Sequence, residues 1–378
     1  MKVLILFEHA NHYHTIDDLG RNLVKQGIQA SSFNVVHWRF KHYAKREDGM
    51  GRFLNLLMRI PGMKGIFNIL FRRQVILNLA CRFDIIDINF FSPIYDPIIE
   101  VLKKRNKSIK ITVWGSDFYR VTPERHEEQR VYYRMVDSIQ METKQIANDF
   151  LKVYPECRDK IALAHFGIIQ LEIIDELLQK ASVKKIRKEM NLPADKLILT
   201  CGTNGSKGHR HAMILDHVDQ LDEQMKRKLF LIIPMTYGGD KEYISEVRQK
   251  AEETGVPFVL LSSFLTLNEL CKYRIVSDIL LTIQETDALS SATQEHIYTE
   301  EIFIAGDWLP YEALRNLGVI YQTTSENAIG RVLAEAVNNF NALKKQCKGN
   351  REKIARFSSW EHAIRDWLNI YRSIKRIT

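Results

Sequence analysis

Short apolar segments alternate with amphipathic segments along the first half of the chain. The strand-like segments are Lys2–Phe7, Gln29–Val36, Asp84–Phe91, Lys110–Trp114 and Ser138–Met141. Stretches with helical periodicity lie between them; the apolar residues of Thr15–Gln26 share one helical face, and Gly27 ends that segment. Because strands alternate with helices, the pattern predicts an α/β fold with a parallel sheet covered by helices on both faces.

The same pattern starts again in the second half of the chain. Its strand-like segments are Lys196–Cys201, Leu229–Pro234, Phe258–Leu261, Ile279–Thr282 and Ile302–Ala305. The boundary falls in Ile168–Pro193, which is rich in Lys, Glu and Gln, and the last segment, Ser359–Ile374, is amphipathic. We therefore predict two Rossmann-like domains over 1–168 and 193–358, a linker over 169–192 and a C-terminal helix over 359–378.

The composition is that of an ordinary globular protein. The 378 residues are 45% apolar and 26% charged, which is enough for two buried cores. The five cysteines are scattered and form no CxxC pair, so the sequence favours a reducing cytosol over a disulfide framework or a zinc site. The apolar run Val3–Phe7 is too short for a signal peptide, and no stretch is long enough to span a membrane. We expect a cytoplasmic protein.

The positive charge is concentrated in one segment. The chain carries a formal net charge of +8, and Arg39–Arg73 holds nine Lys or Arg residues against two acids. Bulky apolar residues such as Phe53, Leu57 and Phe67 alternate with these charges, a pattern typical of helices that lie on an anionic membrane surface. The alternative is two ordinary amphipathic helices. Nucleic acid ranks lower as a partner because no recognition motif is present.

The segment after the predicted strand Ile279–Thr282 has the strongest chemical signal. It contains QETDALSSATQEH, in which small residues open a predicted helix and Asp287 and Glu295 stand eight positions apart. Free amides and the helix dipole suit a diphosphate at the N-terminus of this helix. One carboxylate would then lie at the mouth of the helix, and the other could accept ribose hydroxyls. The alternative is a Ser-capped helix with two solvent-exposed acids.

A second candidate, CGTNGSKGHRH over Cys201–His211, follows another predicted strand. Its glycines, including Gly202, permit tight turns, Lys207 and Arg210 add positive charge, and successive backbone amides can form an anion site. A diphosphate is again the natural ligand, although the segment lacks the spacing of a P-loop. A basic surface loop without function is the alternative.

Two loops of the first half could hold the acceptor or a catalytic base. The motif WGSD ends the predicted strand Lys110–Trp114, so we expect Ser116 and Asp117 to be exposed there, where Asp117 could orient an acceptor hydroxyl or act as a base. A helix cap is the alternative. In the loop after the first strand, Asn11, His12 and His14 could bind an acceptor or a phosphate, or supply a base. No spacing requires a metal site.

These motifs resemble those of glycosyltransferases with the GT-B fold. WGSD, Lys160–Gly167 (KIALAHFG) and Ile302–Glu312 (IFIAGDWLPYE) resemble segments of that fold. Asp287 and Glu295 have the spacing of the Glu-x7-Glu motif of family-4-like members, with Asp replacing the first Glu and Ser290 replacing a usual Gly. Ile233–Tyr243 (IPMTYGGDKEY) is similar to lipid-linked 4-acetamido-fucosyl transferases.

The resemblance implies a donor site in the C-terminal domain and an acceptor site in the N-terminal domain, with the C-terminal helix crossing back to the latter. The implied donor-binding residues are Gly202, Asn204, Lys207, Arg210, Thr236, Tyr237, Ser290, Ser291 and Glu295. With the loops described above, the catalytic candidates are Asp117, His12 and Asp287, and the acceptor-binding candidates are His14, Asn11 and Trp114. No metal and no cofactor is implied besides the nucleotide diphosphate sugar, because a helix dipole and basic side chains neutralise the leaving diphosphate.

The sequence therefore predicts the transfer of a sugar from a nucleotide diphosphate donor to a surface glycan. We expect this acceptor to be lipid-linked and to lie at the inner membrane face, because the basic segment 39–73 belongs to the acceptor domain. A nucleotide-sugar epimerase of the same fold is one alternative. A catalytically silent partner subunit is a second, motivated by the departures at Asp287 and Ser290. A basic lipid- or nucleic-acid-binding protein without a nucleotide site is a third.

Overall fold

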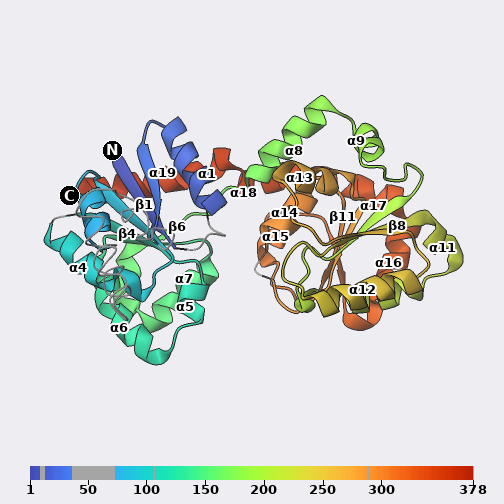
Figure 1. Cartoon of the computed structure of the whole chain (residues 1–378), viewed down its shortest axis with the longest axis horizontal. Helices are drawn as coiled ribbons and strands as arrows, with labels where there is room; N and C mark the ends of the chain where they lie inside the picture. Colours follow the sequence, from blue (N-terminus) through green and yellow to red (C-terminus); the bar gives the residue numbers. More distant parts are fainter. Residues whose placement is uncertain (9–12, 36–72, 106, 288, 378) are drawn as a thin grey trace, which may run out of the picture. The chain divides into compact units, whose positions relative to one another are not determined.

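The computed structural model describes residues 1–8, 13–35, 73–105, 107–287 and 289–377. The chain forms two compact units (Figure 1). Unit 1 comprises Met1–Gly167 together with Trp360–Thr378, and unit 2 comprises Ile168–Ser359. The C-terminal segment thus packs with the first half of the chain and not with the domain that precedes it in sequence.

Unit 1 is built on a parallel sheet with the strand order β2-β1-β3-β4-β5-β6. The strands are β1 (Lys2–Phe7), β2 (Gln29–Asn34), β3 (Ile85–Asn89), β4 (Ser108–Thr112), β5 (Ser138–Met141) and β6 (Ile161–Leu163). The first five confirm the predicted strands, although β4 begins and ends two residues earlier than expected. Strand β6 pairs with β5 at the sheet edge and has only three residues, too few to give a periodic signal.

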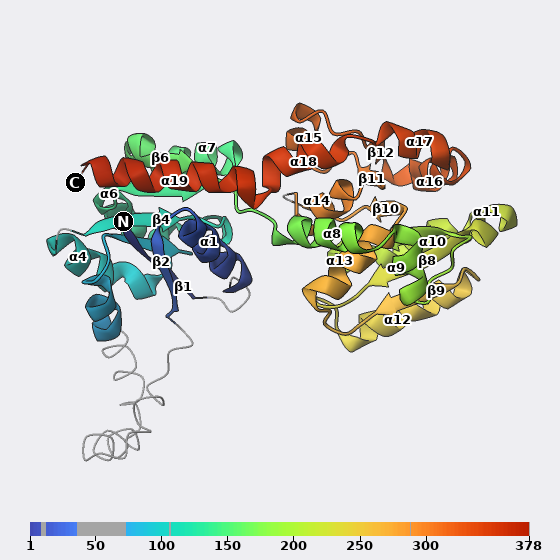
Figure 2. The same ribbon diagram turned by 90° about the horizontal axis from the view of Figure 1, so that it is seen from above.

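The helices of unit 1 cover both faces of this sheet (Figures 1 and 2). They include α1 (Tyr13–Lys25), α4 (Asp96–Lys104), α5 (Ser116–Tyr119), α6 (Pro123–Met135), α7 (Lys144–Val153) and α19 (Trp360–Ile377), with 3-10 turns η3 (Pro93–Tyr95) and η4 (Pro155–Lys160). Residues 73–80 are helical as well. Helices α6 and α7 begin at threonine N-caps, whose hydroxyls accept amides of the first turn. Helix α19 confirms the predicted amphipathic C-terminal helix.

The two faces of the unit 1 sheet differ in character. Side chains alternate between faces along a strand, and one face carries apolar residues such as Ile86, Ile88 and Ile111, which belong to the main core of the unit. The opposite face carries Asp87 and Lys110, both fully buried, and Lys110 Nζ lies 3.0 Å from each carboxylate oxygen of Asp87. This side of the sheet therefore combines a buried ion pair with buried apolar residues such as Val3 and Ile5.

Helix α19 packs on this charged face. The Tyr371 hydroxyl donates to Asp87 Oδ2 at 2.6 Å, and Lys110 Nζ lies 4.3 Å from the centre of the Trp367 ring. Trp367 Nε1 also donates to the carbonyl of His165 at 2.8 Å. Burial lowers the pKa of Lys110, while the charge of Asp87 opposes that change. Because a buried charge without its partners is strongly destabilising, these contacts fix α19 on the sheet.

Unit 2 repeats the architecture with the strand order β12-β11-β10-β7-β8-β9, also parallel. The strands are β7 (Leu197–Cys201), β8 (Leu229–Pro234), β9 (Phe258–Leu261), β10 (Ile279–Thr282), β11 (Ile302–Gly306) and β12 (Gln322–Thr324). The first five confirm predicted strands within one residue. The sequence analysis missed β12, a three-residue edge strand without an apolar run.

The helices of unit 2 enclose its sheet (Figure 1). They are α8 (Ile169–Lys180), α9 (Val183–Glu189), α10 (His211–Asp219), α11 (Glu223–Lys228), α12 (Lys241–Glu253), α13 (Leu267–Val276), α14 (Ser291–Tyr298), α15 (Glu312–Asn316), α16 (Ile329–Asn338), α17 (Phe340–Gln346) and α18 (Asn350–Ser358), with 3-10 turns η5 (Lys207–His209) and η6 (Glu326–Ala328). The segment expected to be a linker, 169–192, contains helices α8 and α9. Leu171 and Ile186 from these helices are buried in the unit 2 core, which explains why both segments are amphipathic.

Among the helices that the structure describes, none is long and apolar enough to cross a membrane.

We predict that Tyr371→Phe lowers the free energy of unfolding by about 1.5–3 kcal/mol, because it removes a buried hydrogen bond to the charged Asp87. The matched control is Tyr119→Phe. Its hydroxyl donates to Asp149 at 2.9 Å, but Tyr119 is 53% exposed, so we expect a loss below about 1 kcal/mol. Urea denaturation followed by circular dichroism measures both, and equal losses would contradict the role assigned to Tyr371.

Candidate functional site

The candidate site lies at the topological switch point of the unit 2 sheet. Strands β8 and β9 lie on one side of β7, and β10, β11 and β12 lie on the other. Ligands bind beyond the carboxyl ends of the strands at such a point. The loops that follow β7 and β10 meet there: the Gly202 amide donates to Leu281 O at 3.0 Å, and the Glu285 amide donates to Gly208 O at 2.9 Å. The fold thus brings together the two segments predicted to bind a diphosphate.

The loop after β7 depends on Gly202, which has a φ of +70°. A Cβ atom at this position would lie 2.9 Å from His211 Nε2, so a side chain is excluded by backbone conformation and by space. The Asn204 side chain accepts the Ser206 amide at 2.9 Å, and this contact closes a turn. Asn204 therefore shapes the loop in the structure as it stands.

The loop after β8 joins the same edge. The Gly205 amide donates to the carbonyl of Tyr237 at 2.7 Å, which ties the two loops together. Of the two predicted donor contacts here, Thr236 is half-buried and Tyr237 is 59% exposed. An exposed aromatic side chain at this edge is available to a ligand.

Two histidines that the sequence analysis did not single out lie beneath the β7 loop, next to Gly202. His209 and His211 are buried, and their rings lie 5.8 Å apart. Burial lowers the pKa of His209 to about 4 and that of His211 to about 3. Both rings are therefore neutral at physiological pH, so they support the loop without adding positive charge.

The two cations of this loop are already paired with carboxylates. Lys207 Nζ lies 3.2 Å from Asp240 Oδ2. Arg210 has a left-handed backbone with φ 55°, and its guanidinium is paired with Glu326 and lies 3.9 Å from Glu285 Oε1. The predicted positive charge of this loop is thus balanced within the chain, because acids from other loops converge on the same edge.

Helix α14 begins at the second predicted segment, and Asp287 lies at its mouth as expected. Ser290 is the N-cap, and its hydroxyl accepts the Thr293 amide at 3.4 Å. The Ser290 amide donates to both oxygens of Asp287, each at 3.2 Å, so this amide is engaged by a carboxylate. The exposed Ser291 begins the helix proper. Leu289 has a φ of 64°, a strained conformation typical of functional loops.

A buried tyrosine orients Asp287. The Tyr311 hydroxyl donates to Asp287 Oδ2 at 2.5 Å, and Tyr311 is 1% exposed. Burial and the neighbouring carboxylate both raise the pKa of Tyr311, so the phenol remains protonated and donates. The predicted segment Ile302–Glu312 contains Tyr311, but no sequence pattern indicated this contact with a residue of another loop.

Glu295 is buried on the inner side of α14 and is not a solvent-exposed acid. It is 2% exposed, and its Oε2 accepts from Arg274 Nε of helix α13 at 3.0 Å. Arg274 Nη1 also lies 2.6 Å from His296 Nε2, and His296 Nδ1 is paired with Glu301. Burial lowers the pKa of His296 well below its usual value and raises that of Glu301. This buried network fixes the orientation of the Glu295 carboxylate.

The carboxyl edge of the unit 1 sheet corrects the expectation for Asp117. This carboxylate is 2% exposed, and its two oxygens accept the amides of Phe91 and Trp114, both at 2.9 Å. Burial raises the pKa of Asp117 to about 6, although these hydrogen bonds oppose the rise. Asp117 joins the loops after β3 and β4 and is not the exposed acid that was predicted, because α5 turns its side chain inward.

Other residues at this edge are placed as follows. The Trp114 ring packs against Phe166, with ring centres 4.8 Å apart. Glu8, which follows β1, accepts a short hydrogen bond from the Ser92 hydroxyl after β3; this contact crosses the switch point of the unit 1 sheet. Asn11, His12, the side chain of His14 and nearly all of the basic segment 39–73 lie outside the described residues.

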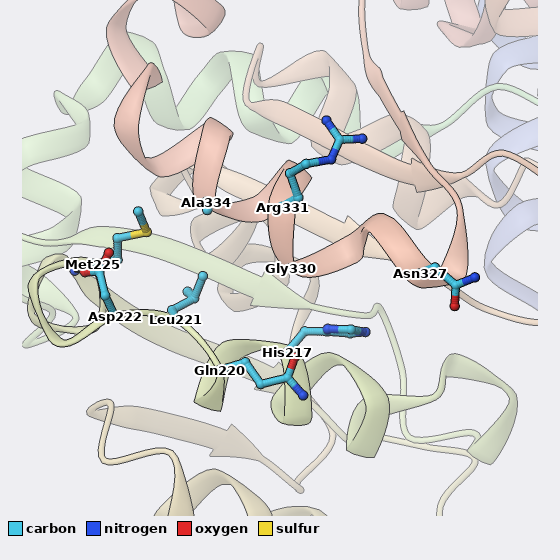
Figure 3. A pocket seen from close by; sticks show the side chains of 9 residues that line it. All are labelled: His217, Gln220, Leu221, Asp222, Met225, Asn327, Gly330, Arg331 and Ala334. Atoms are coloured by element: carbon cyan, nitrogen blue, oxygen red, sulfur yellow. Dashed lines mark hydrogen bonds between the residues drawn. The ribbon is translucent and has the colours of Figure 1, made fainter.

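A pocket of about 440 Å³ lies in the groove between α10, α11 and α16 (Figure 3). Figure 3 shows Met225 at one end of the pocket and Asn327 at the other, with His217 between them. Its lining contains none of the predicted site residues. We therefore place the candidate site at the loop edge and not in this groove. Within the described ranges, no group of three or more His, Cys, Asp or Glu side chains could hold a metal ion.

Comparison with known structures identifies the architecture as the GT-B fold, two Rossmann-like units. A glycosyltransferase from Rickettsia africae matches with a TM-score of 0.72 and 13% identity, over 100% of this chain and 99% of that one. HepE from Anabaena, in complex with UDP and glucose, matches with a TM-score of 0.64 and 12% identity, over 99% and 100% of the chains. UDP-GlcNAc 2-epimerase from Neisseria meningitidis matches with a TM-score of 0.63 and 12% identity, over 98% and 100%. No family model and no curated protein matches the sequence.

We predict that Gly202→Ala lowers the unfolding free energy by about 1–3 kcal/mol more than Gly255→Ala. Gly255 has a φ of +67° and no atom near its Cβ position, whereas Gly202 has a φ of +70° and the close contact with His211. Gly255→Ala therefore reports backbone strain alone, about 1 kcal/mol, and the excess at Gly202 reports overpacking. Urea denaturation of both variants measures the difference, and equal losses would mean that the β7 loop relaxes without cost.

The buried histidines predict a pH dependence of stability. A histidine with a depressed pKa contributes stability that is present above its unfolded pKa of about 6.5 and is lost as the pH falls toward the folded value. For His211, with a folded pKa of about 3, stability should fall by about 1.4 kcal/mol per pH unit between pH 6 and pH 4. His211→Gln should remove this part of the slope in urea titrations at pH 7, 6, 5 and 4. An unchanged slope would contradict the burial of a neutral ring.

Proposed function

We propose that the chain is a glycosyltransferase whose unit 2 binds a nucleotide diphosphate sugar at the edge formed by the loops after β7, β8 and β10. The observation that carries the proposal is the convergence of three phosphate-compatible features at one switch point. They are the glycine-containing loop 202–210, the cations Lys207 and Arg210, and the N-terminus of α14. When the carboxylates that face them move aside, these groups offer N–H donors and positive charge to a diphosphate.

In this proposal Glu295 binds the ribose. Arg274 holds Oε2 of Glu295 at 3.0 Å, so we assign the ribose hydroxyl to Oε1. Because Glu295 is 2% exposed, the ribose has to enter the loop edge to reach this oxygen. Asp287 contacts the transferred sugar, with its carboxylate oriented by Tyr311. The leaving diphosphate is neutralised by Lys207, Arg210 and the amides of α14 and not by a metal ion, since fixed dipoles and cations stabilise developing negative charge.

The structural neighbours support a nucleotide-sugar ligand. HepE has been crystallised with UDP, with UDP and glucose, and with UDP-glucose, and the Neisseria enzyme has been crystallised with UDP-GlcNAc. Their low identity to this chain leaves the base and the sugar open. The epimerase neighbour also makes nucleotide-sugar epimerisation the second candidate, and this activity would need no acceptor.

The acceptor side of the proposal concerns unit 1. We propose a hydroxyl of a lipid-linked surface glycan as acceptor, bound near Trp114 and the residues Asn11, His12 and His14. The basic segment 39–73 would attach the cytoplasmic enzyme to the inner face of the membrane through anionic lipid. Because both oxygens of Asp117 are occupied by backbone amides, His12 is the better candidate for the base.

The first test is a thermal-shift screen against UDP, GDP, dTDP, CMP and ADP. A ligand at a hundred times its dissociation constant adds about 2.7 kcal/mol of stability. We expect one diphosphate to raise the melting temperature of the wild type, and Glu295→Gln, which keeps the shape of the side chain, to lose most of that response. Glu335→Gln on the exposed side of α16 is the control and should keep it. If no nucleotide stabilises the wild type, the donor-site proposal is wrong.

The nucleotide found in this way selects the sugar donors for an activity assay. A transferase should release the nucleotide faster when acceptor glycans or lipid-linked oligosaccharides are added. An epimerase should convert its nucleotide sugar at the same rate with or without them, and chromatography of the nucleotide sugars distinguishes the two.

A further inference from the structure

Three potential anion-binding groups of the candidate donor site face a carboxylate of the chain itself. Lys207 Nζ lies 3.2 Å from Asp240 Oδ2, and the Ser290 amide donates to Asp287 at 3.2 Å. The Arg210 guanidinium is paired with Glu326. Carboxylates and phosphates are bound by the same donors, so these side chains occupy positions that a phosphate would take.

The pair between Arg210 and Glu326 joins distant parts of unit 2. Arg210 precedes helix α10, whereas Glu326 begins η6, directly after the edge strand β12. A second carboxylate, Glu285 of the β10 loop, lies 3.9 Å from Arg210 Nε. The guanidinium also lies 5.6 Å from the centre of the Trp308 ring, a contact that limits its orientations. The arginine is thus directed at the site edge, where two acids compete for it.

Because the pair is exposed, replacing Glu326 by a ligand phosphate at Arg210 costs little free energy. The side chain of Glu326 is 53% exposed and that of Arg210 is 26% exposed, and ion pairs of this kind contribute little to stability because water screens them. Glu326 can therefore swing into solvent while Arg210 remains against Trp308. A phosphate, which carries more charge than a carboxylate and accepts two parallel N–H bonds from a guanidinium, is the stronger partner.

We propose that Glu326 is an affinity-determining residue of the donor site, a carboxylate that competes with the donor diphosphate for Arg210 and leaves when the diphosphate binds. This inference rests on the proposed donor site and adds a residue that no motif indicated. Part of the binding energy of the diphosphate is spent on displacing Glu326, so the native site binds more weakly than its cations alone would allow.

The test is isothermal titration calorimetry at constant ionic strength with the nucleoside diphosphate that the screen selects, and with pyrophosphate as a probe that lacks a base. Glu326→Gln should tighten binding of both about twofold to fivefold, the range expected for one exposed ion pair. Glu335→Gln removes the same charge from an exposed position on α16. Its effect on affinity should be clearly smaller than that of Glu326→Gln, because water and salt screen a charge that makes no direct contact with the site.

A double-mutant cycle separates direct competition from a general change of charge. Arg210→Gln should weaken binding, and Glu326→Gln should then have no further effect. The inference is overturned if Glu326→Gln leaves affinity unchanged or weakens it, or if it tightens binding equally without Arg210. These results leave the donor site itself intact, because the wild type still binds nucleotide. If neither a nucleotide nor pyrophosphate binds the wild type, the donor site and this inference both fail.

Discussion

The candidate site depends on the parallel pairing of β7 with β10 at the centre of the unit 2 sheet. About eighty residues separate β7 from β10 along the chain. Their parallel pairing nevertheless places the carboxyl ends of both strands at one edge of the sheet. The Gly202 amide donates to Leu281 O, so the two loops begin side by side. This register joins the loop after β10, and with it the start of α14, to the edge that the loops after β7 and β8 already share through their own pairing.

Both units use buried charge to hold a functional or terminal helix in place. In unit 1, Asp87 and Lys110 are fully buried and Tyr371 joins them from α19. In unit 2, Arg274 of α13 binds the buried Glu295 of α14. Burying such a pair gains little net stability, whereas breaking it is strongly destabilising. We infer that these pairs specify the positions of α19 and α14 more than they stabilise the fold.

The edge proposed as the donor site balances its own charge. Lys207 faces Asp240, Arg210 faces Glu326, and the α14 amide of Ser290 faces Asp287. An edge with several unpaired cations and a bare helix N-terminus would attract any anion. Internal carboxylates neutralise it, and only a ligand with greater charge and suitable geometry can replace them.

The sequence by itself determined the two α/β units, ten of the twelve strands that the structure describes, the amphipathic α19 and the segments 201–211 and 287–295 as candidate phosphate loops. These features follow from local periodicity and from glycine and charge placed after strands, which adjacent residues encode. The edge strands β6 and β12 were less visible because three residues give no period.

Partners far apart in sequence were decided only by the tertiary structure. Asp117 was expected to be exposed and is instead bonded to Phe91 and Trp114, and Glu295 is bound by Arg274. Tyr311 and Glu326 reach Asp287 and Arg210 from separate loops. Whether a carboxylate faces water, a backbone amide or a cation depends on which strands become neighbours, and the order of strands in a sheet is a long-range property that no local pattern carries.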